Sequence, residues 1–378
     1  MKATPYTLQE LVRTRTVLIT GAPNFVAIQL IWRILEVEPA TEIHLIVRGD
    51  QIVRTEEFLS RNPGLGYRVN IHRGSTTEPN FGLHEDTFRV LASTVDDVYH
   101  MAGMYHLGVD PLQVEEVNIR GTRLALDAIR RFTNLNRFHY YSTAFVSGAR
   151  EGVILEEDLE QGQTFRSTFE RTRFTAEMDV RRARLELPIT VYRSSLVVGD
   201  SRTGEIHNLD GPWIFLQAIA RNPDRLPTIL PNSTHFPFNV VPVDYVAHAM
   251  HALSLRPDTA GKTFHLVDPS PVSQASGFRL LWRHVNEGPV KSNFQSQLRE
   301  RLLRIPLFEK ITRDSRDVYN ELDNLQIFNA ANTLKGLTGT GIHCPFFPDY
   351  VAKLVDFARS DAHGWLRQPL MNDDELSL

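Results

Sequence analysis

Short runs of β-branched and other apolar residues alternate along this chain with longer segments in which apolar residues recur every three or four positions. The short runs predict buried strands, and the longer segments predict amphipathic helices. This alternation is typical of repeated strand–helix–strand units, which build a parallel sheet. We therefore expect a Rossmann-type doubly wound α/β fold. The predicted strands are 16–20, 42–47, 68–72, 97–100, 137–142, 189–193 and 263–267, and the clearest predicted helices are 27–36, 117–132 and 169–185.

The segment 201–237 has a different pattern, because prolines and glycines interrupt it repeatedly. Such punctuation favours a cap that crosses the sheet rather than another strand–helix unit. The chain beyond Pro271 is more helical and more charged. We predict a nucleotide-binding-type domain of residues 1–200 with about 238–270, and a smaller, mostly helical substrate-binding cap of residues 201–237 with 271–378.

Composition narrows the classes of function. The 378 residues carry 41 Lys and Arg against 45 Asp and Glu, a formal charge of −4, so nothing suggests a nucleic-acid partner. The single cysteine, Cys344, excludes a disulfide framework and any Cys-based metal site. His248 and His251 lack a third ligand at suitable spacing and are expected on a solvated helix face. We therefore expect no bound metal. No apolar run is long enough to span a membrane, so we expect a cytoplasmic protein.

The first predicted strand leads directly into the turn Gly21-Ala22-Pro23-Asn24-Phe25-Val26-Ala27 and then a helix. In dinucleotide-binding folds a glycine-rich turn here lets the backbone approach a pyrophosphate at the helix N-terminus. Asn24 and Ala27 stand where a G-x-x-G-x-x-G pattern has its later glycines. Asn tolerates a left-handed backbone, but its side chain points toward the phosphate position. A simple strand-to-helix turn is the alternative, so nucleotide binding is expected to be weakened or lost.

Arg48 ends the second predicted strand. An acidic residue at this place favours NAD, whereas a basic one pairs with the 2′-phosphate of NADP. If a nucleotide binds, we expect NADP(H). The alternative is an ordinary solvated arginine.

Eight motifs occur in matching order from Thr16 to about Pro271: VLITGAPNFVA, HLIVRGD, VYHMAGMYHLGVD, VNIRGT, YYSTAFVSG, FERTRFTAE, YRSSLVVGDSRTGEIHNLDGPW and FNVVPVDYVAHAM. On these motifs the chain resembles the extended short-chain dehydrogenase/reductases, and among them the thioester reductase and fatty acyl-CoA reductase (male sterility) branch. The resemblance covers roughly two thirds of the chain. It implies an NADP(H)-dependent reductase acting on an acyl-pantetheine substrate, bound to coenzyme A or to an acyl carrier protein.

The resemblance also assigns a catalytic constellation. It places Thr143 at the catalytic Ser/Thr position, and the family's Tyr-x-x-x-Lys at Phe169-x-x-x-Arg173. The tyrosine exchanges the proton that accompanies hydride transfer, and the lysine lowers its pKa and holds ribose hydroxyls. Phe169 has no ionisable group. Arg173 keeps a positive charge that suits ribose hydroxyls but is unsuited to proton exchange.

The remaining positions implied by the resemblance lie around the nucleotide. Ala102-Gly103 replaces an Ala-Ala pair, Asn118 matches a structural asparagine that could equally cap a helix, and Ser195 follows a strand near the cofactor. Ser75 stands where relatives place an aspartate that accepts from the adenine amino group. By resemblance, the helices 117–132 and 169–185 are expected to form a homodimer contact.

Three hypotheses follow. The first is a protein of this fold that keeps a ligand site but is impaired or unconventional in hydride transfer. The second is an active NADP(H)-dependent reductase that uses Thr143 with a relayed water, or recruits Tyr105, His106 or Tyr141 as proton donor. The third is a non-redox lyase, cyclase or hydrolase built on the same fold.

Overall fold

A computed structural model describes residues 14–61, 66–104, 110–206, 235–286 and 325–360. Its centre is a seven-stranded sheet in the order β10-β7-β5-β4-β1-β2-β3, in which neighbouring strands run parallel. The chain thus winds outward from β1 in both directions, as a doubly wound fold requires. The strands are β1 (Thr16–Thr20), β2 (Glu42–Val47), β3 (Val69–Arg73), β4 (Asp97–His100), β5 (Arg137–Thr143), β7 (Ile189–Ser194) and β10 (Thr263–Leu266).

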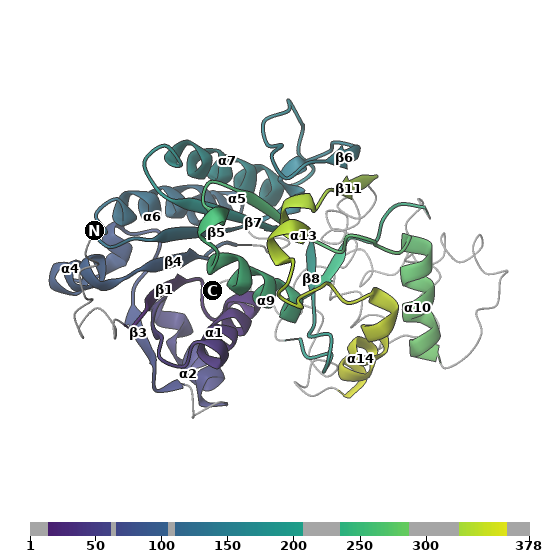
Figure 1. The fold of residues 1–378 in the computed structure, drawn as a ribbon, viewed down its shortest axis with the longest axis horizontal. Helices are drawn as coiled ribbons and strands as arrows, with labels where there is room; N and C mark the ends of the chain where they lie inside the picture. Colours follow the sequence, from purple (N-terminus) through teal and green to yellow (C-terminus); the bar gives the residue numbers. More distant parts are fainter. Residues whose placement is uncertain (1–13, 62–65, 105–109, 207–234, 287–324, 361–378) are drawn as a thin grey trace, which may run out of the picture.

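Helices cover both faces of this sheet (Figure 1). One face packs against α1 (Phe25–Val37), α2 (Ile52–Ser60) and α9 (Val243–Ser254). The other packs against α4 (Glu85–Thr94), α6 (Gly121–Ile129) and α7 (Thr168–Ala183). The central strands are largely apolar because both of their faces are buried. The predicted Rossmann-type architecture is therefore confirmed.

A further apolar cluster lies beyond the sheet. It joins α10 (Gln274–Asn286) and α14 (Phe347–Ser360) to the short parallel pair β8 (Leu196–Val198) and β9 (Val240–Pro242). β6 (Gly152–Ile154) and β11 (Gln326–Phe328) form a second short parallel pair. The chain continues from β11 into α13 (Ala331–Leu337). Most of the predicted cap segment 201–237 lies outside the described residues. The described part of the chain contains no helix that is long and apolar enough to cross a membrane.

Two local predictions were wrong. The predicted helix 117–132 is part of a longer array, α5 (Pro111–Glu115), a π turn η4 (Glu116–Arg120) and α6, so its start lies earlier than the apolar spacing indicated. His251 is only 2% exposed rather than solvated, and its Nε2 lies 2.7 Å from Oε1 of Glu38 at the end of α1. That contact ties α9 to α1.

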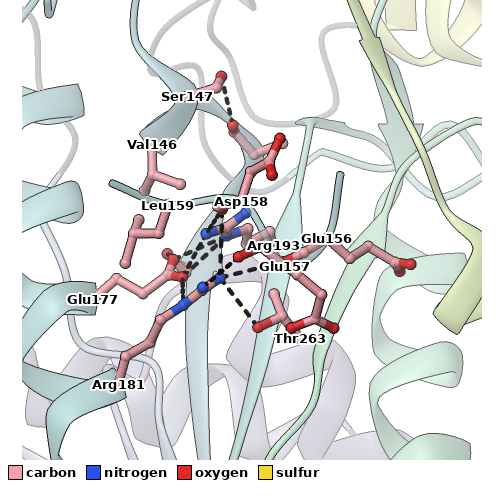
Figure 2. A network of polar contacts seen from close by, with 12 residues as sticks. Val146, Ser147, Glu156, Glu157, Asp158, Leu159, Glu177, Arg181, Arg193 and Thr263 are labelled. Atoms are coloured by element: carbon pink, nitrogen blue, oxygen red, sulfur yellow. Dashed lines mark hydrogen bonds and ion pairs between the residues drawn. The ribbon is translucent and has the colours of Figure 1, made fainter. Parts of the chain in front are cut away.

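A buried ion pair joins α7 to the sheet (Figure 2). Nη2 of Arg193 on β7 lies 2.7 Å from Oε1 of Glu177 on α7, and both side chains are essentially unexposed. The Glu177 carboxylate also accepts from Ser142 Oγ at 2.6 Å and from Arg181 Nε at 3.1 Å. Arg193 in addition donates to the carbonyl of Asp158 at 2.7 Å. This network, called here the Glu177 network, fixes α7 against β5 and β7.

The carboxyl group of Glu177 is ionised at all ordinary pH values. Burial alone would raise its pKa, but the guanidiniums of Arg193 and Arg181 and the Ser142 hydroxyl outweigh burial and lower the pKa from 4.5 to about 2. A carboxyl group with a lowered pKa in the folded state stabilises the fold above its unfolded pKa, and this contribution disappears as the pH falls toward the folded value.

Replacing Glu177 by Gln is expected to lower the free energy of unfolding by about 3–5 kcal/mol, because Arg193 is left as an uncompensated buried charge. Urea unfolding at neutral pH measures the change. Glu186→Gln is the matched control: Glu186 pairs with Arg130 on the surface with 62% of its side chain exposed, so the change should be below about 1 kcal/mol. Equal losses in the two variants would contradict the assigned importance of the Glu177 network.

The same network predicts a pH dependence of stability. The free energy of unfolding should fall as the pH is lowered from 4.5 toward about 2, the interval between the unfolded and folded pKa values of Glu177. Urea titrations at a series of pH values measure this slope. It should be shallower in Glu177→Gln than in the parent protein, and parallel slopes in the two proteins would rule out Glu177 as its source.

Candidate functional site

The predicted site residues gather at the carboxyl ends of β1, β4, β5 and β7, the edge at which parallel sheets bind ligands. Gly21 follows β1 with φ of +91°, a conformation that side chains disfavour. A Cβ atom here would lie 2.5 Å from the carbonyl carbon of Met101 and 2.6 Å from the backbone nitrogen of Ala102. Only glycine therefore allows the turn after β1 to approach the turn after β4 this closely.

Asn24 is the N-cap of α1. Its side-chain oxygen accepts from the backbone N–H of Val26 at 2.9 Å, and its own N–H donates to the Gly21 carbonyl at 2.8 Å. Its φ is −51°, so the left-handed backbone considered from the sequence is not used. Pro23 has no N–H to offer. Several donors that would face an anion at this helix N-terminus are thus absent or already engaged within the turn.

The two other predicted residues of this turn lie on α1. Ala27 is completely buried in the core beneath the turn, and Phe25 is half-buried against the same core. Ala27 therefore takes the packing role that a third glycine has in dinucleotide-binding turns, where the helix approaches the sheet.

Arg48 follows β2 and forms a two-pronged contact with Asp50, with Nε 3.1 Å and Nη2 2.5 Å from the carboxylate oxygens. Arg73, at the end of β3, lies beside the next residue, Gly49: a Cβ on Gly49 would be 2.9 Å from the Arg73 Nε. Because Arg73 is in register with Val47, the parallel pairing brings both arginines to one corner of the sheet. The sequence analysis missed Arg73, although the alignment of two strand ends could have indicated it.

Ser75, the residue in place of an adenine-contacting aspartate, is engaged locally. Its Oγ lies 2.8 Å from Thr77 Oγ1 and accepts from the Thr77 N–H at 3.2 Å. The hydroxyl thus serves the turn that follows β3.

Thr143 ends β5, and its hydroxyl is engaged by the backbone. Oγ1 donates to the Ser194 carbonyl at 3.3 Å and accepts from the Phe145 N–H at 3.3 Å, which caps the 3₁₀ helix η5 (Ala144–Ser147). The Tyr141 hydroxyl lies 2.8 Å from Ser194 Oγ, and burial raises the pKa of Tyr141 to about 12. The other proton donors considered from the sequence, Tyr105 and His106, lie outside the described residues.

Asn118 joins the turn after β4 to α7. Its Oδ1 accepts from the Met104 N–H at 2.8 Å, and its Nδ2 donates to the Met104 carbonyl at 3.1 Å and to Thr172 Oγ1 at 3.0 Å. The residue is fully buried within η4. The alternative of a helix cap is wrong, because Glu115 occupies the N-cap position of this turn and Asn118 lies inside it.

Phe169 and Arg173 stand one helical turn apart near the start of α7. Arg173 is 4% exposed; its Nη2 donates to the Tyr141 carbonyl, and its guanidinium carbon lies 5.3 Å from the centroid of the Tyr140 ring. A Cβ on Gly103 would lie 2.6 Å from Arg173 Nη1. Gly103 therefore leaves the space that the guanidinium occupies, a relation invisible from sequence because the two residues are far apart along the chain.

Ser195 lies just beyond β7 and is 3% exposed. Its N–H donates to the Leu266 carbonyl at 3.4 Å, whereas its Oγ has no hydrogen-bond partner among the described residues. Arg173 Nη1 is likewise without a partner there. No group of three potential metal ligands occurs in the described ranges.

Comparison with known proteins agrees with this geometry. Residues 19–250, more than half of the chain, match the family model described as male sterility protein. One similar curated protein belongs to the linear gramicidin synthase of Brevibacillus parabrevis and is 26% identical over 67% of this chain and 5% of its own length. Another is the fatty acyl-CoA reductase wat of Drosophila melanogaster, 24% identical over 65% of this chain and 55% of its own. This chain thus spans about half or less of these relatives.

Solved structures show the same fold. The terminal R domain of the myxalamid PKS-NRPS biosynthetic pathway has a TM-score of 0.77 and 26% identity, covering 95% of this chain and 93% of that one. The reductase domain of a non-ribosomal peptide synthetase from Mycobacterium tuberculosis has a TM-score of 0.67 and 21% identity, covering 93% of both. The chain belongs to the male sterility family of extended short-chain dehydrogenase/reductases, related to the NAD(P)-dependent thioester and acyl-CoA reductases.

Proposed function

We propose that this protein binds acyl thioesters, held on coenzyme A or on a carrier protein, and is impaired or unconventional in hydride transfer. The observation that carries this proposal is Phe169 on a helix whose register is fixed. Thr172 and Glu177 on α7 contact Asn118 and Ser142, which supports our assignment of Phe169 and Arg173 to the positions of the family's tyrosine and lysine. A positioned general acid contributes roughly 10²–10⁴-fold to rate, and a phenyl ring supplies none of it.

The proposed substrate class draws on the relatives. One structural neighbour, with a TM-score of 0.72 and 19% identity, is a thiolation-reductase di-domain from an archaeal non-ribosomal peptide synthetase. Its name joins a reductase domain to a thiolation domain, the kind of partner that carries a thioester. We infer an acyl-pantetheine ligand for this chain too, delivered at the carboxyl edge of the sheet.

The residues fit a nicotinamide nucleotide unevenly. The close approach at Gly21 and the positive charge of Arg173 suit one, and Arg48 with Arg73 would hold the 2′-phosphate of NADP(H). The turn fits the pyrophosphate less well. Pro23 has no backbone N–H to donate, and the N–H of Val26 already donates to the Asn24 side chain. When bound, the nucleotide would supply hydride. Arg173 would contribute a positive charge beside the nucleotide, and Phe169 would contribute no proton.

Thr143 is a weaker candidate for replacing the missing acid. Its hydroxyl hydrogen is directed to the Ser194 carbonyl, so donation to a substrate would require breaking that bond. The Tyr141 hydroxyl is engaged with the Ser194 hydroxyl at 2.8 Å. These contacts favour the impaired site over an active reductase that uses Thr143 or Tyr141 as its proton donor.

Restoring the family's pair tests the proposal. The double variant Phe169→Tyr/Arg173→Lys should oxidise NADPH with an acyl-coenzyme A substrate about 10²–10⁴-fold faster than the parent protein, because a positioned acid returns. Phe174→Tyr is the matched control: Phe174 lies on the same helix but packs against Phe165 with ring centroids 4.9 Å apart. A parent protein already as fast as the double variant would refute the proposal.

The cap residue of α1 provides a second test. Asn24→Gly should release the Val26 N–H for a phosphate oxygen and tighten NADPH binding about tenfold, at a cost of only a few tenths of a kcal/mol in stability. Asn24→Asp is the control, since it keeps a capping oxygen and adds a negative charge. Calorimetric titration measures both. If Asn24→Gly binds NADPH no more tightly than the parent protein, the side chain of Asn24 is not what weakens the site.

A further inference from the structure

Arg173 is a buried positive charge for which the described protein supplies no counter-ion. The side chain is 4% exposed, yet its contacts are a backbone carbonyl and the face of an aromatic ring, at Tyr141 and Tyr140. No carboxylate lies within ion-pair distance of it in the described part of the chain. Isolated charges are costly to bury, and buried guanidiniums are therefore normally paired.

The acidic residues on either side of Arg173 along α7 are already committed. Glu170, three residues before Arg173, is paired with Arg166 at 2.7 Å. Glu177, one turn after Arg173, is bonded to Arg193 and Arg181 and accepts from Ser142. The single carboxylate of Glu177 thus already pairs with two arginines. Glu177 therefore does not neutralise Arg173.

The guanidinium is also incompletely hydrogen-bonded, and the surrounding backbone leaves room for it. Nη1 is buried and has no partner among the described residues. It lies 2.6 Å from the place of a Gly103 Cβ, and that place is 3.5 Å from Asn118 Oδ1. Nη1 thus sits beside the backbone of the turn after β4, at the edge of the sheet where ligands bind.

We propose that Arg173 and Gly103 form a receiving site for an oxyanion of a ligand, either a carboxylate or a phosphate group. Guanidiniums bind both groups through paired, charge-assisted hydrogen bonds, and such an anion would supply the missing partner of Nη1 together with the missing counter-charge. Gly103 is part of the site because any larger residue would displace Nη1. This inference stands on the buried charge and does not depend on thioester binding or on hydride transfer.

The test uses the full chain with sodium phosphate and sodium acetate as probes, each compared with sodium chloride at equal ionic strength. Both the melting temperature and calorimetric binding are measured. Phosphate or acetate should raise the melting temperature of the parent protein by mass action, and Arg173→Gln should lose the response. A response to phosphate alone assigns a phosphate group, and a response to acetate assigns a carboxylate.

Three variants locate the response. Gly103→Ala should weaken anion binding at least about tenfold, and it keeps the test valid if Arg173→Gln does not fold. Arg171→Gln is the matched control, because Arg171 is an exposed arginine on the same helix paired with Glu115. Arg123→Gln is a second control, because Arg123 is an exposed arginine paired with Asp179. Both controls should keep the full response.

Two results would overturn the proposal. One is a parent protein whose stability and heat of binding are the same in phosphate, acetate and chloride. The other is an anion response that persists in Arg173→Gln or disappears in Arg171→Gln, which would place the anion elsewhere. Failure of NADPH or thioester binding in the experiments above would leave this result unaffected, because neither probe used here is a nucleotide or a thioester.

Discussion

The buried pair of Glu177 and Arg193 fixes the helix on which every inference about the site depends. Neither charge is tolerable without the other in the interior, because an unpaired buried ion is strongly destabilising. Their contact, extended through Ser142 and Arg181, holds α7 in one register against β5 and β7. The positions of Phe169, Thr172 and Arg173 relative to the sheet follow from that register.

This arrangement separates the residues that hold the fold from those that carry chemistry. Glu177 pairs with Arg193, and Asn118 donates to Thr172; both contacts hold α7 in place. The neighbouring positions 169 and 173 on the same helix carry a phenyl ring and a guanidinium. Neither of these two side chains takes part in the contacts that fix the helix through Glu177 and Thr172. The Arg173 guanidinium fits because residue 103 is glycine, since a Cβ there would lie 2.6 Å from Arg173 Nη1.

Local patterns in the sequence predicted the sheet well, because its strands are short apolar runs buried on both faces and its helices have one apolar face. The need for glycine at position 21 also follows from a local turn. Relations across the sheet were not predictable in this way. The approach of Arg73 to Gly49, the packing of Arg173 against Gly103 and the pairing of His251 with Glu38 each join elements distant in sequence. The prediction for His251 was wrong because a polar residue on a helix is expected to be solvated until the partner that buries it is known.

The central claim that we propose is that position 169 supplies no proton and that none of the described neighbouring groups replaces it. The dependence on pH of single-turnover NADPH oxidation with an acyl-coenzyme A substrate tests this most directly. Phenylalanine does not ionise and a guanidinium stays protonated, so any residual rate should be flat between about pH 6 and about pH 9. A rate well above the uncatalysed reaction that titrates within this interval would show that another residue acts as the proton donor, and it would contradict the account.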